Sequence, residues 1–141
     1  MRVGDRFPIE ALRLGTGDGP VVVYFYPRAG TEGCTLEANE FNRSLPRLVE
    51  GGVRLVGVSI DPEEANAQFA ADCELDFPLV SDEGGELTSQ LGLMTNYGEY
   101  GDMAARVTVL LDENGVIQEL WSVDDIPSHV QEVVERSTTP T

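Results

Sequence analysis

Cys34 is the residue of this chain that is best placed for nucleophilic chemistry. It follows an apolar run and a glycine-containing loop, at the position where a helix is predicted to begin. A thiolate at a helix start is stabilised by the positive end of the helix dipole and by backbone N–H groups that have no helical acceptor. The alternative is a buried structural thiol, which is the commoner role of a single cysteine. Position alone therefore makes Cys34 a candidate nucleophile.

The other residues that could join such chemistry are Cys73 and His129, the second cysteine and the single histidine of the chain. A zinc site needs three or four protein ligands, so no metal centre is predicted, and no other cofactor is expected. Cys73 is either a buried core residue or a redox partner of Cys34, and both possibilities stay open. His129 is interpreted as structural, because a histidine at the start of the last helix has no implied geometry to Cys34.

The elements that must position Cys34 are a strand and a helix. The continuous apolar and aromatic run 21–26 predicts a strand that is buried on both faces, in the middle of a sheet. After the loop 28–33, apolar residues recur with helical spacing as far as Val49. Pro46 is expected to kink or split this helix, and the pair Gly51-Gly52 is expected to end it.

A second strand, 53–60, leads into a strong helix-start signal. Asp61 can cap the helix, Pro62 can occupy its first position, and Glu64 can complete a capping box. The apolar stripe of this helix places Cys73 on the face that is directed toward the sheet.

The rest of the chain completes an α/β pattern. Asn-Gly at 114–115 indicates a hairpin turn between two strands. The predicted fold is a single domain over 1–141, with a central mixed sheet flanked by helices and a disordered tail at 137–141. The predicted elements are a strand at 77–81, a helix at 86–91, a poorly defined stretch at 92–102, strands at 105–111 and 116–122, and a helix at 127–136.

The charge balance excludes two classes of partner. The chain has 25 acidic and nine basic residues, all nine of them arginine, and a net charge of −16. Nucleic acid and anionic membranes are not expected as partners, because both require a basic surface. The acidity is interpreted as a solubility or salt-adaptation trait. A secretory signal pattern is not seen, so a cytoplasmic location is expected.

The residues around Cys34 carry a resemblance to a known family. The pattern Pro27-x-x-x-Thr31-x-x-Cys34 lies between the predicted strand and helix, and it resembles the active-site signature of the peroxiredoxins. With Tyr-Phe-Tyr-Pro at 24–27 and Gly-Cys-Thr-Leu-Glu-Ala at 33–38, the sequence is most similar to the bacterioferritin comigratory protein or peroxiredoxin Q branch. The similarity extends over roughly residues 20–135 and implies the thioredoxin-like fold.

This resemblance implies a thiol peroxidase in which Cys34 attacks hydrogen peroxide or an organic hydroperoxide and becomes a sulfenic acid. Thr31 would orient Cys34 and the peroxide through its hydroxyl, and the N–H groups of Gly33 and Cys34 would donate to the reacting oxygens. Pro27 would shield the thiolate from water. The expected reductant is a thioredoxin-like partner or a low-molecular-weight thiol, and the expected assembly is a monomer or weak dimer.

Two charged residues would support the same site. Arg106, at the family's hairpin arginine position, would stabilise the thiolate and the departing oxygen. Glu37 would pair with Arg106 and orient it. The alternatives are a solvated strand arginine and a first-turn helix acid favoured by the dipole.

The chain departs from the family at the resolving cysteine. Many members of the branch carry it five residues after the nucleophile, where this chain has Asn39. Others carry it on the helix after the second strand, near Ala70 and one turn from Cys73. Cys73 is therefore a possible resolving cysteine.

Two other functions compete with the peroxidase. A thioredoxin-like disulfide oxidoreductase is disfavoured, because Cys34 is not part of a Cys-x-x-Cys pair. A non-catalytic binding or holdase module remains an alternative, since a fold does not guarantee a function.

Overall fold

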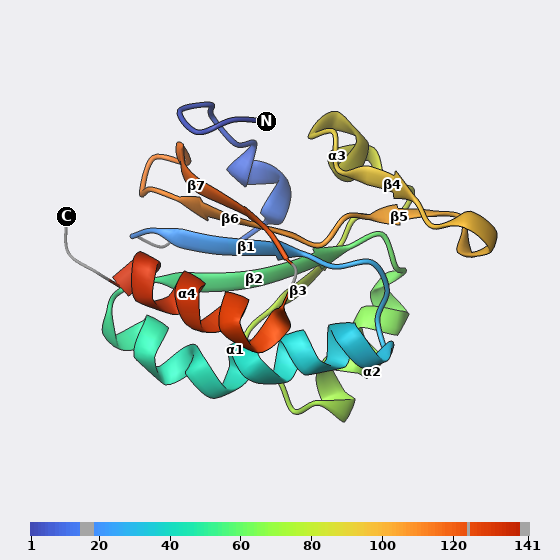
Figure 1. Cartoon of the computed structure of the whole chain (residues 1–141), viewed down its shortest axis with the longest axis horizontal. Coiled ribbons are helices and arrows are strands. Elements are labelled where there is room, and N and C mark those ends of the chain that lie inside the picture. Colours follow the sequence, from blue (N-terminus) through green and yellow to red (C-terminus); the bar gives the residue numbers. More distant parts are fainter. Residues whose placement is uncertain (15–18, 124, 139–141) are drawn as a thin grey trace.

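A five-stranded mixed sheet organises the chain, and Figure 1 shows the computed structural model, which describes residues 1–14, 19–123 and 125–138. The strand order is β3-β2-β1-β6-β7, so β1 is central, as its sequence predicts. β1 is parallel to β2, β2 is parallel to β3, and the pairs β1–β6 and β6–β7 are antiparallel. The bounds are β1 Val21–Phe25, β2 Arg54–Ser59, β3 Leu79–Ser81, β6 Val107–Leu111 and β7 Ile117–Ser122.

Helices cover both faces of the sheet. The long helices α1 (Glu32–Glu50) and α4 (Ile126–Thr138) lie side by side on one face, and α2 (Glu63–Asp72) lies near the start of α1 (Figure 1). The 3₁₀ helix η1 (Ile9–Leu12) and the short helix α3 (Glu86–Gln90) lie on the opposite side. The stretch 92–102 forms most of a small hairpin whose elements are β4 (Met94–Asn96), η2 (Gly98–Tyr100) and β5 (Asp102–Ala104).

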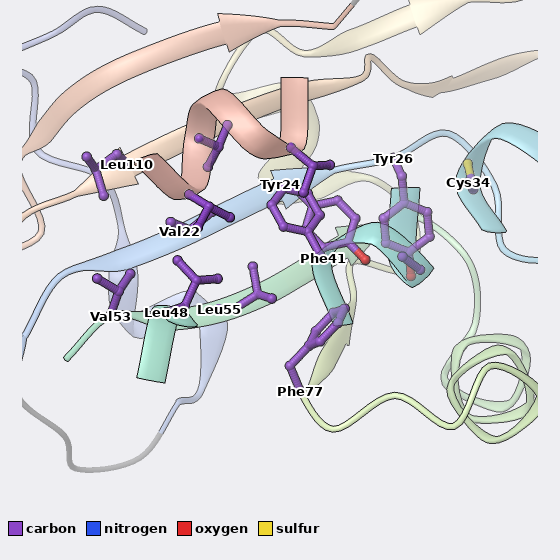
Figure 2. Packing of buried hydrophobic residues seen from close by; sticks show 14 of the residues in the cluster. Val22, Tyr24, Tyr26, Cys34, Phe41, Leu48, Val53, Leu55, Phe77 and Leu110 are labelled. Carbon is purple, nitrogen blue, oxygen red and sulfur yellow. The ribbon is translucent and has the colours of Figure 1, made fainter. Parts of the chain in front are cut away.

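Each face of the sheet has its own hydrophobic core because side chains alternate along a strand. Val22, Tyr24 and Tyr26 point into the cluster beneath α1 and α4, and this cluster includes Cys34 (Figure 2). Val21, Val23 and Phe25 point into the other cluster, which includes Phe7 and Leu12 from the N-terminal segment. Every residue of β1 is fully buried, which explains its unbroken apolar sequence.

Helix α1 corrects one expectation about proline. The helix is not split at Pro46 but runs continuously to Glu50, and Gly51 ends it as predicted. Phe41 and Leu48, on either side of Pro46, are fully buried in the core, so packing holds the helix across the missing hydrogen bond. Pro46 itself is on the exposed side, where water can hydrate the carbonyl that it leaves free.

The start of α2 and the end of α4 correct two further expectations. Pro62 is the N-cap residue of α2 and no side chain of the described residues caps the helix, so the predicted capping roles of Asp61 and Glu64 are wrong. The Asp61 carboxylate instead accepts hydrogen bonds from Ala29 N–H and the Ser59 hydroxyl, at 2.8 and 2.7 Å. The predicted disordered tail is wrong at 137 and 138, which belong to α4, and the rest of it lies outside the described residues.

The other predicted elements are confirmed within about two residues at their ends, including the Asn-Gly hairpin between β6 and β7. In the described part of the chain, no helix has both the length and the apolar character needed to span a bilayer.

Candidate active site

Cys34 lies in the first turn of α1, close to the end of the central strand. Thr31 is the N-cap residue of the helix, with extended backbone angles, and the Cys34 side chain is 1% exposed. Among the described residues, neither Gly33 N–H nor Cys34 N–H has a hydrogen-bond acceptor. Such first-turn donors are available to a ligand that carries negative charge.

Arg106 lies directly against the Cys34 thiol. Its Nη2 atom donates to Cys34 Sγ at 3.4 Å, and its Nη1 atom donates to Glu37 Oε1 at 2.7 Å. The sheet explains this contact, because Phe25 at the end of β1 is the partner of Val107 at the start of β6. The residue before β6 therefore meets the loop that follows β1, and the expectation that Glu37 pairs with Arg106 agrees with the structure.

The Glu37–Arg106 pair is strongly buried on the carboxylate side. The Glu37 side chain is inaccessible to solvent, and no described residue is bonded to its Oε2 atom. Burial raises the pKa of Glu37 to about 7, although Arg106 opposes the shift. Burial alone would lower the pKa of Arg106, but the neighbouring Cys34 and Glu37 outweigh it and raise that pKa above its usual value. Arg106 thus remains a fixed cation against the thiol.

Gly33 allows Arg106 to approach the start of the helix. A Cβ atom at this position would lie 3.1 Å from Arg106 Nη2 and 3.7 Å from Ile126 Cδ1. A spacing of 3.1 Å is tighter than nine in ten real Cβ contacts, so a side chain at this position would push the guanidinium by a few tenths of an ångström. Gly33 therefore contributes space as well as its N–H group.

Thr31 and Pro27 occupy the loop that leads to Cys34. The Thr31 hydroxyl donates to the carbonyl of Arg28 at 2.9 Å, which leaves its oxygen lone pairs free to accept from an incoming O–H group. Pro27 is buried, and Thr31 is exposed. The loop that leads to Cys34 thus combines a buried proline with an exposed hydroxyl group.

Cys73 is placed apart from this cluster of contacts. It is the C-cap residue of α2, half-buried against the same hydrophobic core that contains Cys34, and both cysteines are free thiols. Burial, together with Asp72, raises the pKa of the Cys73 thiol. The reduced fold therefore does not hold Cys73 as a ready thiolate.

Sequence reasoning missed Tyr97, which belongs to the stretch without a periodic pattern. Its hydroxyl donates to the carbonyl of Ala104 at 3.1 Å. Burial raises the pKa of Tyr97, Arg106 lowers it and Cys34 raises it, so this phenol lies within electrostatic reach of the thiol. The only sequence signal for Tyr97 was an aromatic residue in an irregular segment shortly before the strand that follows Arg106.

His129 has the structural position that its sequence context suggests. Its Nε2 atom is 2.8 Å from the Thr108 hydroxyl, and its ring packs edge-on against Trp121 with centroids 6.3 Å apart. Burial, with Arg106 as a second cause, lowers the pKa of His129 to about 4. The ring is therefore neutral at pH 7.

Together these residues form a site for attack on an electrophilic oxygen. A thiolate at Cys34 would face the guanidinium of Arg106, and the N–H groups of the first turn would donate to the negative charge that develops on the leaving oxygen.

Comparisons with known proteins support the same chemistry. Residues 7–120 match the AhpC/TSA family. The chain is 34% identical to a putative peroxiredoxin bcp of Coxiella burnetii, over 96% of this chain and 98% of the relative. It is 37% identical to the chloroplastic peroxiredoxin Q of Sedum lineare, over 82% of this chain and 62% of that longer protein.

Solved structures agree with this assignment. A variant of the Xylella fastidiosa peroxiredoxin Q superposes with a TM-score of 0.85 at 28% identity, covering 96% of this chain and 94% of the other. The bacterioferritin comigratory protein of Xanthomonas campestris, which has alkyl peroxide reduction activity, superposes with a TM-score of 0.81 at 27% identity, covering 96% of each chain. The chain belongs to the AhpC/TSA family and is a peroxiredoxin of the bcp and peroxiredoxin Q kind, a thiol-dependent peroxidase with a thioredoxin-like fold.

Proposed function

We propose that Cys34 is the peroxidatic cysteine and that Arg106 is its main electrostatic partner. The observation that carries the proposal is the pair of hydrogen bonds from Arg106, one to Cys34 Sγ and one to the buried carboxylate of Glu37. Glu37 orients one edge of the guanidinium so that the other edge faces the sulfur. A planar donor held in this way is preorganised for charge on the sulfur and on a nearby oxygen.

The proposed first step is a displacement on the peroxide. The Cys34 thiolate attacks the terminal oxygen of hydrogen peroxide or an organic hydroperoxide, so that an S–O bond forms and the O–O bond breaks. The departing hydroxide or alkoxide is stabilised by Arg106, takes up a proton and leaves as water or an alcohol. Thr31 accepts from the peroxide O–H group, the N–H groups of Gly33 and Cys34 donate to its oxygens, and Pro27 excludes bulk water.

The proposed second step removes the sulfenic acid. The Cys73 sulfur attacks the Cys34 sulfur, so that an S–S bond forms, the S–O bond breaks and water leaves. A thioredoxin-like dithiol or a low-molecular-weight thiol then reduces the disulfide. The position of Cys73 at the end of a helix supports this role, because helix ends open at lower free-energy cost than a whole domain.

The location and the assembly of the protein are proposed from its cysteines and its charge. A reducing compartment such as the cytoplasm fits two free cysteines and a thiol-driven cycle. A monomer or weak dimer fits the net charge of −16, because like charges oppose self-association.

The rate of peroxide consumption tests the first step, and peptide mapping of peroxide-treated protein tests the second. Cys34→Ser should abolish rapid peroxide consumption, because serine gives no usable anion at neutral pH. Wild type treated with a small excess of hydrogen peroxide should contain the Cys34–Cys73 disulfide, whereas Cys73→Ser should accumulate sulfinic acid at Cys34. Retention of most of the rate in Cys34→Ser would exclude the first step. Accumulation of Cys34 sulfinic acid in the wild type, with Cys73 still free, would exclude the second.

A further inference from the structure

Helix α2, which ends at Cys73, is attached to the protein through two buried side chains. These are Asn66 and Phe69, while the other residues of the helix are partly or fully exposed. Both side chains contact Tyr26, the residue that follows strand β1. The Tyr26 hydroxyl donates to Asn66 Oδ1 at 2.5 Å, and the rings of Tyr26 and Phe69 lie 5.9 Å apart. Tyr26 is therefore the shared docking point of this helix.

The Asn66 amide is satisfied entirely within the protein. Its Nδ2 atom donates to the hydroxyls of Ser59 and Ser81, at 3.0 and 2.8 Å, and its Oδ1 atom accepts from Tyr26. The side chain is 2% exposed, so breaking this network inside the fold would leave buried polar atoms without partners. When the helix detaches, water can form hydrogen bonds with these polar atoms instead. The strength of the network thus controls how readily α2 detaches.

The same network reaches the loop that carries the active site. Tyr26 immediately precedes Pro27, and Figure 2 shows Tyr26 and Cys34 at the same end of one hydrophobic cluster. Ser59 donates to Asp61, and the Asp61 carboxylate also accepts the N–H of Ala29 in the loop between β1 and α1. A chain of hydrogen bonds therefore connects the Cys34 loop with the helix that ends at Cys73.

We propose that Tyr26 is a positioning residue for the resolving step: its hydroxyl, bound to Asn66, holds α2 and Cys73 in the docked state. The inference rests on the proposed resolving role of Cys73. In the reduced fold both thiols are free, Cys34 is 1% exposed and Cys73 is half-buried at the end of α2, so the S–S bond forms and water departs when this end of the helix moves. The Tyr26–Asn66 bond opposes this movement together with the packing of Phe69 and the hydrogen bonds of Asn42 to the backbone of Glu74 and Asp76, so its strength affects the rate of disulfide formation.

The chain offers a closely matched pair of variants. Tyr26→Phe removes the hydroxyl bound to Asn66 and keeps the ring that contacts Phe69. Tyr24→Phe is the control, because Tyr24 lies on β1, is equally buried, and its hydroxyl has no hydrogen-bond partner among the described residues. Ser81→Ala weakens the same network without touching Tyr26, and it serves if Tyr26→Phe does not fold.

The first measurement is independent of peroxidase activity. In a Cys34→Ser background, we would measure hydrogen exchange of the α2 amides and alkylation of Cys73 by iodoacetamide. Loss of one buried hydrogen bond should accelerate both by about tenfold in Tyr26→Phe, and in the same direction in Ser81→Ala. Tyr24→Phe should match the parent. Equal exchange in all the variants would overturn the role of Tyr26 in holding α2.

The second measurement follows the Cys34–Cys73 disulfide after one equivalent of hydrogen peroxide, by rapid acid quenching and mass analysis. Disulfide formation should be faster in Tyr26→Phe than in Tyr24→Phe, with sulfenic acid formation unchanged. Faster opening of α2 without faster disulfide formation would overturn the claim that this contact affects the rate. A wild type that forms no disulfide would refute the resolving role of Cys73 and the rate claim with it, while the exchange result would still decide whether Tyr26 holds α2.

Discussion

Replacing Arg106 by methionine should separate the catalytic role of this residue from its structural role. Methionine keeps an apolar stem but removes the donors to Cys34 Sγ and Glu37 Oε1. The loss of one preorganised donor to developing charge typically costs a factor of about 100 or more in rate. The rate constant for peroxide consumption at pH 7 should therefore fall about 100-fold.

The structural effect should depend on pH. Burial already raises the pKa of Glu37 to about 7 with Arg106 in place, and removal of the cation raises it further. Below pH 7 the carboxyl is mostly protonated in both proteins, so the free energies of unfolding differ little through ionisation. Above pH 7 the wild type ionises beside Arg106 and the variant does not. The destabilisation of Arg106→Met should then grow by about 1.4 kcal/mol per pH unit, reaching about 3 kcal/mol near pH 9.

Urea unfolding between pH 6 and pH 9 measures how the destabilisation caused by Arg106→Met changes with pH. The Cys34→Ser background removes the titration of the thiol, which also contacts Arg106. The double variant Arg106→Met/Glu37→Gln is the control, because it has no carboxyl at position 37. In the Cys34→Ser background its destabilisation should not change with pH, and with Cys34 present its rate of peroxide consumption should stay as low as that of Arg106→Met. A single variant with a nearly unchanged rate would make Arg106 a structural residue only. A destabilisation that stays constant across this pH range would refute the account of the Glu37 carboxyl.

Four further predictions concern single substitutions and added salt. Gly33→Ala should lower the peroxide rate severalfold although alanine favours helix, because its Cβ would crowd Arg106 Nη2; kinetics and a melting curve measure the two effects. Glu37→Gln should gain stability relative to wild type as the pH rises from 4.5 to 7, because the folded pKa lies above the ordinary 4.5. His129→Gln should gain stability relative to wild type as the pH falls from 6.5 to 4, because the pKa of His129 in the folded protein lies below 6.5. The midpoints of urea unfolding measure both effects. If the midpoint of Glu37→Gln does not rise relative to wild type with rising pH, or that of His129→Gln with falling pH, the corresponding pKa assignment is wrong. The melting temperature should rise with sodium chloride, because salt screens the repulsion within a chain of net charge −16, and a flat or falling series would argue against salt adaptation.

The sequence by itself determined the features that depend on neighbouring residues. The central strand follows from its unbroken apolar run, the hairpin from Asn-Gly, and the place of Cys34 from a strand, a loop and a helix start in succession. These are local consequences of side-chain period and backbone preference. The Pro-x-x-x-Thr-x-x-Cys pattern is equally local, so the resemblance to the peroxiredoxins could be seen before any fold was known.

Only the tertiary structure decided which distant residues meet. Arg106 reaches Cys34 because the end of β1 pairs with the start of β6, and an exposed strand arginine would have had the same sequence signal. Asp61 has the local pattern of a helix cap, yet its carboxylate accepts a hydrogen bond from the Ala29 N–H group of a remote loop. The Tyr26–Asn66 contact has no sequence signal at all. Contacts between separated segments depend on how the sheet and helices pack, and no local pattern contains that information.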